Sequence, residues 1–124
     1  MQYLLLVYTD TELMDKLPSE EFDVKMRSCL RHADDQLERG KYLMCQQLQP
    51  ARTARTVRVR QGRASVVDGP FAETKEMLAG FTLIEADSME EAVRMAHEQP
   101  WTAYGAIEVR PVSDIAAMRA RVGA

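Results

Sequence analysis

The order of apolar and amphipathic segments predicts an α+β domain in which an antiparallel sheet carries helices on one face. Two observations support this fold class. Short strand-like runs alternate with two helical patterns, and the second half of the chain repeats the strand–helix order of the first half. With 124 residues, 46% of them hydrophobic, the chain is long enough to form a single domain (residues 1–124) with its own core.

The first half of the chain predicts a strand, a helix and a second strand. The run Tyr3–Tyr8 is apolar at every position, which predicts a strand buried on both faces, and residues 9–17 are predicted as polar connecting chain. A helix follows, with Ser19 expected to cap its free N–H groups and Gly40 expected to end it. Apolar residues at steps of three and four form one stripe along this helix. Tyr42–Leu48 is predicted as the second strand.

A β-hairpin is predicted between the second strand and the next strand of the sheet. Thr56–Arg60 alternates with a period of two, Gln61 and Gly62 turn the chain, and Arg63–Val67 returns. The arginines in and before this hairpin are the one basic concentration in a chain of net charge −3. Because those within the strand alternate with valines, we interpret them as its outward side and do not expect nucleic acid as a partner.

The last part of the chain predicts a helix, a strand and a short C-terminal helix. The strand of residues 80–86 comes first; Ser88 and Glu91 then match a capping box at a helix start. Residues 106–111 alternate as a strand, and Ser113–Val122 is predicted as a short helix. Together the elements follow the ferredoxin-like order β-α-β-β-α-β, with an inserted hairpin and both main helices on one face of the sheet. The other face would be bare and apolar, which predicts a symmetric homodimer.

Residues 67–76 (VDGPFAETKE) hold the densest set of functional groups in the chain. Asp68 ends a strand and is followed by Gly69 and Pro70, which favour a sharp turn, so we consider it a candidate general base. The alternative is that its carboxylate accepts backbone N–H groups within its own turn. His32 is the candidate partner because histidine titrates near neutral pH. The alternative for His32 is a position at the helix edge, with its ring partly in solvent.

Four further residues are candidates for ligand binding: Phe71, Glu73, Lys75 and Arg110. Phe71 is expected to anchor the turn in the core. Lys75 or Arg110 would orient an anionic group of a substrate. For Glu73 and Lys75 the alternative is a solvated turn with weak local ion pairs.

The remaining chemistry-bearing residues predict neither a metal site nor an organic cofactor. Cys29 and Cys45 lie in apolar patterns without metal-ligand spacing, so we expect free thiols in or near the core, in a reducing cytoplasm. No apolar run approaches the roughly 20 residues of a membrane span. The apolar start of the chain is shorter than a signal peptide requires, so a cytoplasmic location is expected.

Several of these segments together resemble the YCII-related (DGPF-domain) family, which is part of the dimeric α+β barrel group. Residues 68–76 (DGPFAETKE) are the most specific match, and the strand Tyr3–Tyr8, the pair Gly80–Phe81 and the segment Glu108–Val112 match as well. The resemblance runs almost end to end. It implies a dimer with a cleft beside the sheet. It also implies acid–base chemistry by a His–Asp pair, here His32 and Asp68, and an association of some relatives with extracytoplasmic-function sigma factors.

Two hypotheses for function follow from the sequence. The first is a cofactor-free acid–base enzyme acting on a small organic molecule in a cleft near Asp68. The second is a non-catalytic ligand-binding or protein-interaction module linked to sigma-factor transcription regulation. A closed pocket that places Asp68 beside a second titratable group would favour the enzyme, and an exposed apolar or charged patch away from Asp68 would favour the interaction module.

Overall fold

The computed structural model describes all 124 residues and contains a four-stranded sheet, a separate two-stranded hairpin and four α-helices. The strands are β1 (Gln2–Asp10), β2 (Tyr42–Gln47), β3 (Arg55–Arg60), β4 (Arg63–Asp68), β5 (Glu76–Glu85) and β6 (Gly105–Pro111). The helices are α1 (Thr11–Lys16), α2 (Ser19–Glu38), α3 (Met89–His97) and α4 (Ile115–Val122), with 3₁₀ turns η1 (Ala51–Thr53) and η2 (Pro100–Tyr104).

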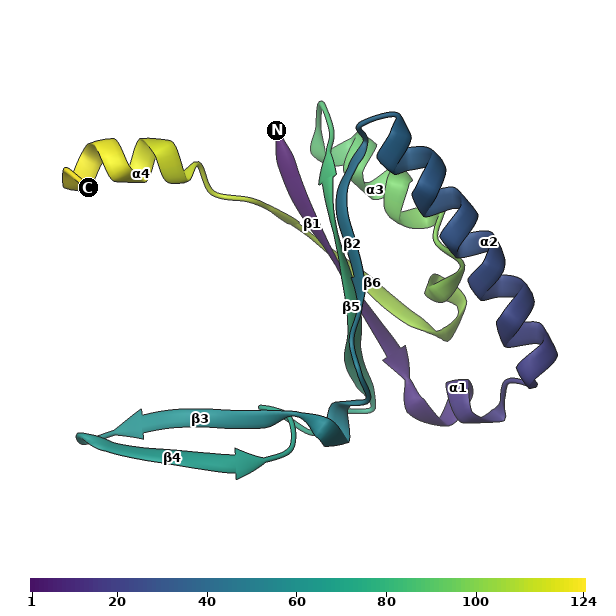
Figure 1. Ribbon diagram of the computed structural model, residues 1–124, viewed down its shortest axis with the longest axis horizontal. Helices are drawn as coiled ribbons and strands as arrows, with labels where there is room; N and C mark the ends of the chain where they lie inside the picture. The colour runs from purple at the N-terminus through teal and green to yellow at the C-terminus, as the bar shows by residue number, and fades with distance from the viewer.

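The four-stranded sheet has the order β2-β5-β1-β6, and every neighbouring pair is antiparallel. The first strand lies at the centre, where Leu5 pairs with Thr82 of β5 on one side and with Val109 of β6 on the other. Helices α2 and α3 both lie on one face of this sheet (Figure 1). This arrangement confirms the predicted ferredoxin-like topology and the inserted hairpin.

The two faces of β1 differ, which corrects the prediction of a strand buried equally on both sides. Tyr3, Leu5 and Val7 point toward the helices and are at most 7% exposed. Leu4 and Leu6 point to the other face and are only half-buried. Because successive side chains of a strand point to opposite faces, the second face of the sheet is apolar yet has no covering layer within the chain.

Residues 11–16 form helix α1, which corrects the prediction of connecting chain there. The helix begins at the buried Asp10, whose Oδ1 accepts hydrogen bonds from the backbone N–H groups of Glu12 (2.9 Å) and Leu13 (3.3 Å). A capping carboxylate satisfies backbone donors that a helix start leaves free. An aspartate directly after an apolar strand was the sequence signal for this helix.

The two main helices begin differently. Ser19 was expected to cap α2 but is its first helical residue, and Pro18 occupies the cap position without a side-chain hydrogen bond. Proline already lacks the N–H that would need a partner. Ser88 caps α3 as predicted, because its Oγ accepts the backbone N–H of Glu91 at 3.1 Å.

The hydrophobic core fills only one end of the space between sheet and helices. Tyr3, Tyr42 and Ile84 form a row of large side chains across β1, β2 and β5, and they pack with residues of α3 and with Ala33. Ala33 is the only buried residue of the 20-residue helix α2. The space between the rest of α2 and the sheet is therefore less completely filled by side chains.

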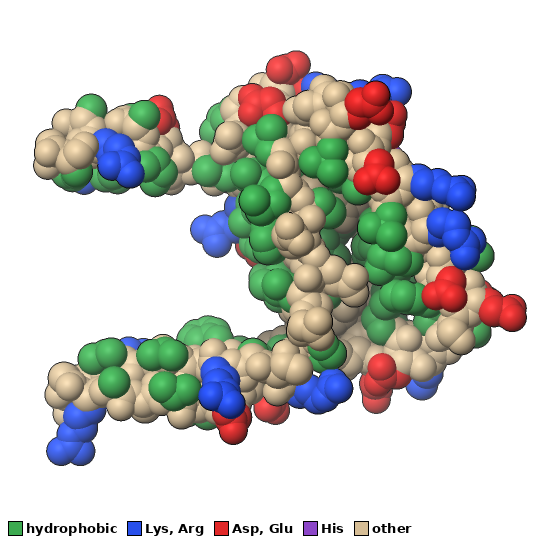
Figure 2. Space-filling view, viewed as in Figure 1, with side chains coloured by type: hydrophobic (Ala, Val, Ile, Leu, Met, Phe, Trp, Pro, Cys, Tyr) green, Lys and Arg blue, Asp and Glu red, His purple; other side chains and the backbone are tan.

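Two segments project from the sheet on the side opposite the helices (Figure 1). The hairpin β3–β4 extends from one end of the sheet and α4 from the other, so the bare sheet face lies between them. We call the bare sheet face, the hairpin β3–β4 and α4 together the clamp, and the two projecting segments its arms. Apolar side chains line the inner sides of both projecting segments in Figure 2. The exposed apolar residues of the hairpin strands are Val57, Val59, Val66 and Val67, and those of α4 are Ile115, Met118 and Val122.

Candidate functional site

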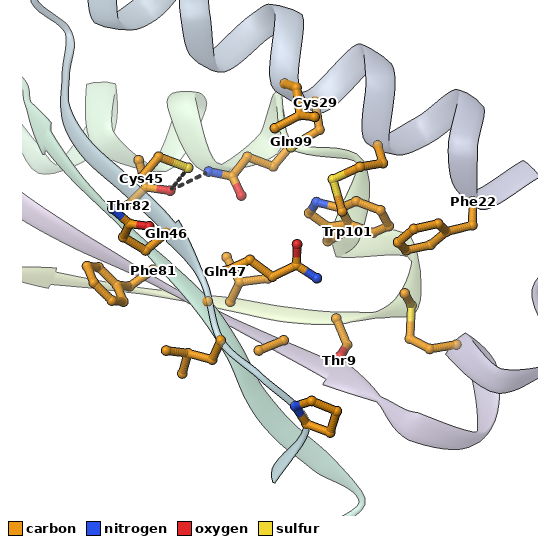
Figure 3. Close-up of a pocket in the computed structure, with 18 residues that line it drawn as sticks. Thr9, Phe22, Cys29, Cys45, Gln46, Gln47, Phe81, Thr82, Gln99 and Trp101 are labelled. Atoms are coloured by element: carbon orange, nitrogen blue, oxygen red, sulfur yellow. Dashed lines mark hydrogen bonds between the residues drawn. The ribbon is translucent and has the colours of Figure 1, made fainter. Parts of the chain in front are cut away.

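A cavity of about 370 Å³ lies between α2 and the sheet, at the end that the core does not fill (Figure 3). Its walls come from α1, α2, β1, β2, β5 and the segment before and within η2. The lining residues are Val7, Thr9, Met14, Phe22, Met26, Cys29, Leu30, Cys45, Gln46, Gln47, Leu48, Pro50, Ala79, Gly80, Phe81, Thr82, Gln99 and Trp101.

Small side chains on the sheet create the floor of this cavity. Gly80 of β5 pairs with Val7 on one side and with Gln47 on the other, so the middle of this row has no side chain. A Cβ atom on Gly80 would lie 2.7 Å from the carbonyl oxygen of Gln46, so the close approach of β2 requires glycine at this position. The same glycine removes the side chain that would otherwise fill the space beneath α2.

Aromatic rings separate the first half of α2 from the sheet. Trp101, which is 8% exposed, stands below the helix with its ring centroid 5.8 Å from that of Phe22. Figure 3 shows both rings at one end of the cavity. Two rings in contact act as a rigid spacer, because each has only two side-chain torsions. The helix cannot collapse onto the Gly80 floor while Trp101 occupies this place.

A short hydrogen-bonded chain lies at the other end of the cavity. Gln99, which is 6% exposed, donates from Nε2 to the Tyr42 hydroxyl and to Thr82 Oγ1, both at 3.4 Å. Thr82 in turn donates to Cys45 Sγ at 3.5 Å. These side chains hold the segment before η2 against the sheet and fix the orientation of the Gln99 amide.

Both cysteines are free, as predicted, and both line the cavity. Burial raises the pKa of the Cys29 thiol, an effect that a hydrogen bond with Trp101 partly offsets. A thiol whose pKa is raised is protonated at neutral pH and is a poor nucleophile. The cavity wall is therefore suited to contact a ligand and not to attack it through Cys29.

Asp68 lies at the base of the hairpin and does not line this cavity. Its side chain is 91% exposed, and its Oδ1 lies 3.5 Å from Nε of Arg55 across the hairpin. It accepts no backbone hydrogen bond in its turn, so the alternative role predicted for it is wrong. The turn is held instead by Gly69, whose N–H donates to the carbonyl of Ala54 at 2.7 Å, and by Thr56, which donates to the Gly69 carbonyl at 2.9 Å.

His32 lies on α2, on the helix-covered side of the sheet, whereas Asp68 lies on the opposite, projecting hairpin (Figure 1). The ring of His32 packs edge-on against Tyr42. Its Nε2 lies 3.1 Å from a carboxylate oxygen of Glu98, but the two atoms do not form a hydrogen bond. Its side chain is 30% exposed. One chain therefore does not bring His32 and Asp68 together as a pair.

The four predicted ligand-binding residues also lie outside the cavity. Phe71 is 75% exposed, which corrects the expectation of a core anchor, and its ring centroid lies 5.0 Å from the guanidinium of Arg58. Glu73 is exposed and Arg110 lies on β6 opposite Leu4, on the bare sheet face.

Lys75 makes a contact that the sequence did not reveal. Its Nζ lies 3.6 Å from Oδ2 of Asp10, whose side chain is only 7% exposed. The lysine thus connects the turn after the hairpin with the carboxylate that caps α1. This position indicates that Lys75 links the base of the hairpin to the sheet.

Two observations concern other kinds of site. No group of three or more His, Cys, Asp or Glu side chains is arranged to hold a metal ion. No helix is long and apolar enough to cross a membrane.

Comparison with known proteins gives the family. The YCII-related domain matches residues 1–116. The chain belongs to the YCII-related family. An uncharacterised protein of Rhizobium meliloti (strain 1021) is 38% identical over 117 residues, a match that covers 91% of this chain and 93% of the relative. The family match confirms the resemblance inferred from residues 68–76, and it assigns no reaction.

Alkaline pH should destabilise the protein through Tyr42. Burial raises the pKa of Tyr42 from 10.0 to about 12, so between these pH values the unfolded chain releases a proton that the folded chain retains. The free energy of unfolding should therefore fall with rising pH in this window, by about 2–3 kcal/mol in total. Urea denaturation from pH 8 to pH 12 measures the decline.

Tyr42→Phe should remove the Tyr42 part of this decline, while costing about 1 kcal/mol at neutral pH for the lost hydrogen bond to Gln99. Tyr104→Phe, which lies outside the Gln99 hydrogen bonds, is the matched control and should decline like the wild type. Equal alkaline declines in wild type and Tyr42→Phe would show that Tyr42 does not carry the effect.

Proposed function

We propose that this member of the YCII-related family is a homodimeric protein that binds a small organic molecule in the cavity beneath α2. The observation that supports ligand binding is the cavity itself, whose volume of about 370 Å³ falls within the range of about 300–1,000 Å³ of small-molecule sites. The cavity opens to solvent and its wall is mostly apolar, so the free protein leaves apolar surface in contact with water there. A ligand that fills the cavity would remove this surface from water.

Catalysis at Asp68 is the weaker proposal. The carboxylate is almost fully exposed and pairs with Arg55, and none of the six predicted site residues lines the cavity. An acid–base enzyme needs a base within hydrogen-bond reach of its substrate, and the cavity wall holds no carboxylate, imidazole or amine. Binding without chemistry is therefore the function that the geometry favours.

The clamp supports the proposal of a homodimer. On the bare sheet face Leu4 pairs with Leu83 and Leu6 with Phe81, and both arms add exposed apolar residues on their inner sides (Figure 2). Monomeric proteins rarely expose contiguous apolar surface of more than a few hundred Å². A second copy, related by a two-fold axis, would cover this face with the same apolar surface of its own.

Residues 68–76 gain a role in this arrangement. They lie at the base of the hairpin, where Gly69 fixes the turn with φ of 105° and Lys75 contacts Asp10. We propose that these residues set the angle at which the hairpin leaves the sheet, so that its apolar side faces the partner copy.

Ligand binding can be tested with N-phenyl-1-naphthylamine, a neutral apolar dye that becomes fluorescent in apolar sites. Met26 lines the cavity, and Val24 lies two residues earlier on the solvent side of the same helix, 61% exposed. We expect the wild type and Val24→Trp to bind the dye in a saturable manner. Met26→Trp should bind it at least tenfold more weakly, because the indole fills the cavity. Equal dye affinities for the two variants would place the dye elsewhere and refute the cavity as the site.

The dimer can be tested by light scattering after size exclusion. The wild type should have about twice the chain mass of 14.1 kDa. Leu6→Asp should reduce the mass to that of one chain, since it places a charge at the centre of the bare sheet face. Val93→Asp, on the exposed side of α3, is the control and should leave the mass unchanged. A monomeric wild type would refute the homodimer and favour another protein, such as a sigma factor, as the partner for this face.

A further inference from the structure

The composition of the cavity wall narrows the class of ligand, an inference that rests on the proposed ligand-binding function. Among the 18 residues whose atoms line the cavity, none has a carboxylate, lysine, arginine or histidine side chain. An ionised ligand would lose its hydration in this cavity without gaining a counter-charge, which is strongly unfavourable. The wall therefore selects against charged molecules.

One polar atom on the wall is free to accept a hydrogen bond from a ligand. The Nε2 of Gln99 is occupied by Tyr42 and Thr82, whereas its Oε1 makes no hydrogen bond within the chain and is accessible from the cavity. Because Thr82 donates its own hydroxyl hydrogen to Cys45, it accepts from Gln99, and this keeps Nε2 on that side of the amide. Figure 3 shows the Gln99 oxygen turned toward the middle of the cavity.

Because this oxygen is accessible from the cavity, a ligand that displaces solvent there leaves it unpaired at a cost unless the ligand donates a hydrogen bond to it. Phe22 and Trp101 offer an aromatic wall at the opposite end. In Figure 3 the Gln47 amide lies between these two ends, and Thr9 lies nearer Trp101. The Gln99 acceptor and the two aromatic rings thus lie at different ends of the cavity.

We propose that the ligand is a neutral, mostly apolar molecule with one hydroxyl or amide N–H group, which donates to Gln99 Oε1 while the apolar part lies against Phe22 and Trp101. The site would thereby select its ligand by two properties, the absence of charge and the position of one hydrogen-bond donor.

Three probes of nearly equal size separate these properties: 1-octanol, its isomer heptyl methyl ether, and octanoate. Their affinities follow from displacement of N-phenyl-1-naphthylamine at pH 8, and from the fluorescence of Trp101, the only tryptophan of the chain, which lines the cavity. We expect 1-octanol to bind about threefold to tenfold more tightly than the ether, because only the alcohol donates to Gln99. Octanoate should bind at least tenfold more weakly than the alcohol, because its charge has no partner.

The outcomes separate the inference from the proposed function. If the dye binds in the cavity but octanoate displaces it as well as 1-octanol does, the ligand is not selected for neutrality, and ligand binding stands. If the ether matches the alcohol, or if no probe displaces the dye, the role of Gln99 as acceptor is wrong. If the dye itself does not bind in the cavity, the proposed function and this inference both fail.

Gln99→Met tests the acceptor directly. It should lower the affinity for 1-octanol to that for the ether and leave the ether unchanged. Gln49→Met, on an exposed residue outside the cavity, is the matched control and should leave all three affinities unchanged. Should Gln99→Met fail to fold, the comparison of the three probes on the wild-type chain decides the question alone.

Discussion

The antiparallel pairing of β1 with β5 is the constraint on which the rest of the structure depends. It places Tyr3 beside Ile84, Leu5 beside Thr82 and Val7 beside Gly80, so side chains on the helix-covered face become smaller from one end of the sheet to the other. At the end of Tyr3 and Ile84, large side chains fill the core between the sheet and the helices. At the end of Val7 and Gly80, Trp101 holds α2 away from the sheet, and a cavity results. One register thus sets both stability and a place for a ligand.

The same register determines what the opposite face presents. Every second residue of β1 and β5 faces away from the helices, and the large apolar ones among them have no cover within the chain. The hairpin and α4 extend on this side (Figure 1), so the proposed dimer surface and the cavity lie on opposite faces of one sheet. In our account the ligand enters on the side of α2 and the partner copy binds on the other, with the family-matching residues 68–76 on the partner's side.

The sequence predicted the main strands and helices because their signals are local: alternation in Ala106–Pro111, the capping box at Ser88 and the turn between β3 and β4. It did not predict the cavity, because an unfilled volume depends on how segments distant in sequence meet. Gly80 and Trp101 are 21 positions apart, and neither carries a catalytic group. The prediction followed the density of functional groups instead and selected Asp68, which the fold leaves in solvent. Gly80 beside Phe81 and a lone tryptophan after Pro100 were the available signals.

The most direct test of the central claim, that the ligand site is the cavity beneath α2, is methyl NMR of ¹³C-methionine-labelled protein with N-phenyl-1-naphthylamine. Met14 and Met26 line the cavity, whereas Met44 and Met118 are exposed, one on β2 and one on α4. The aromatic rings of the dye shift the resonances of nearby methyl groups. We predict that the resonances of Met14 and Met26 move on titration while those of Met44 and Met118 stay in place. Shifts confined to Met44 and Met118 would place the dye in the clamp and contradict the account.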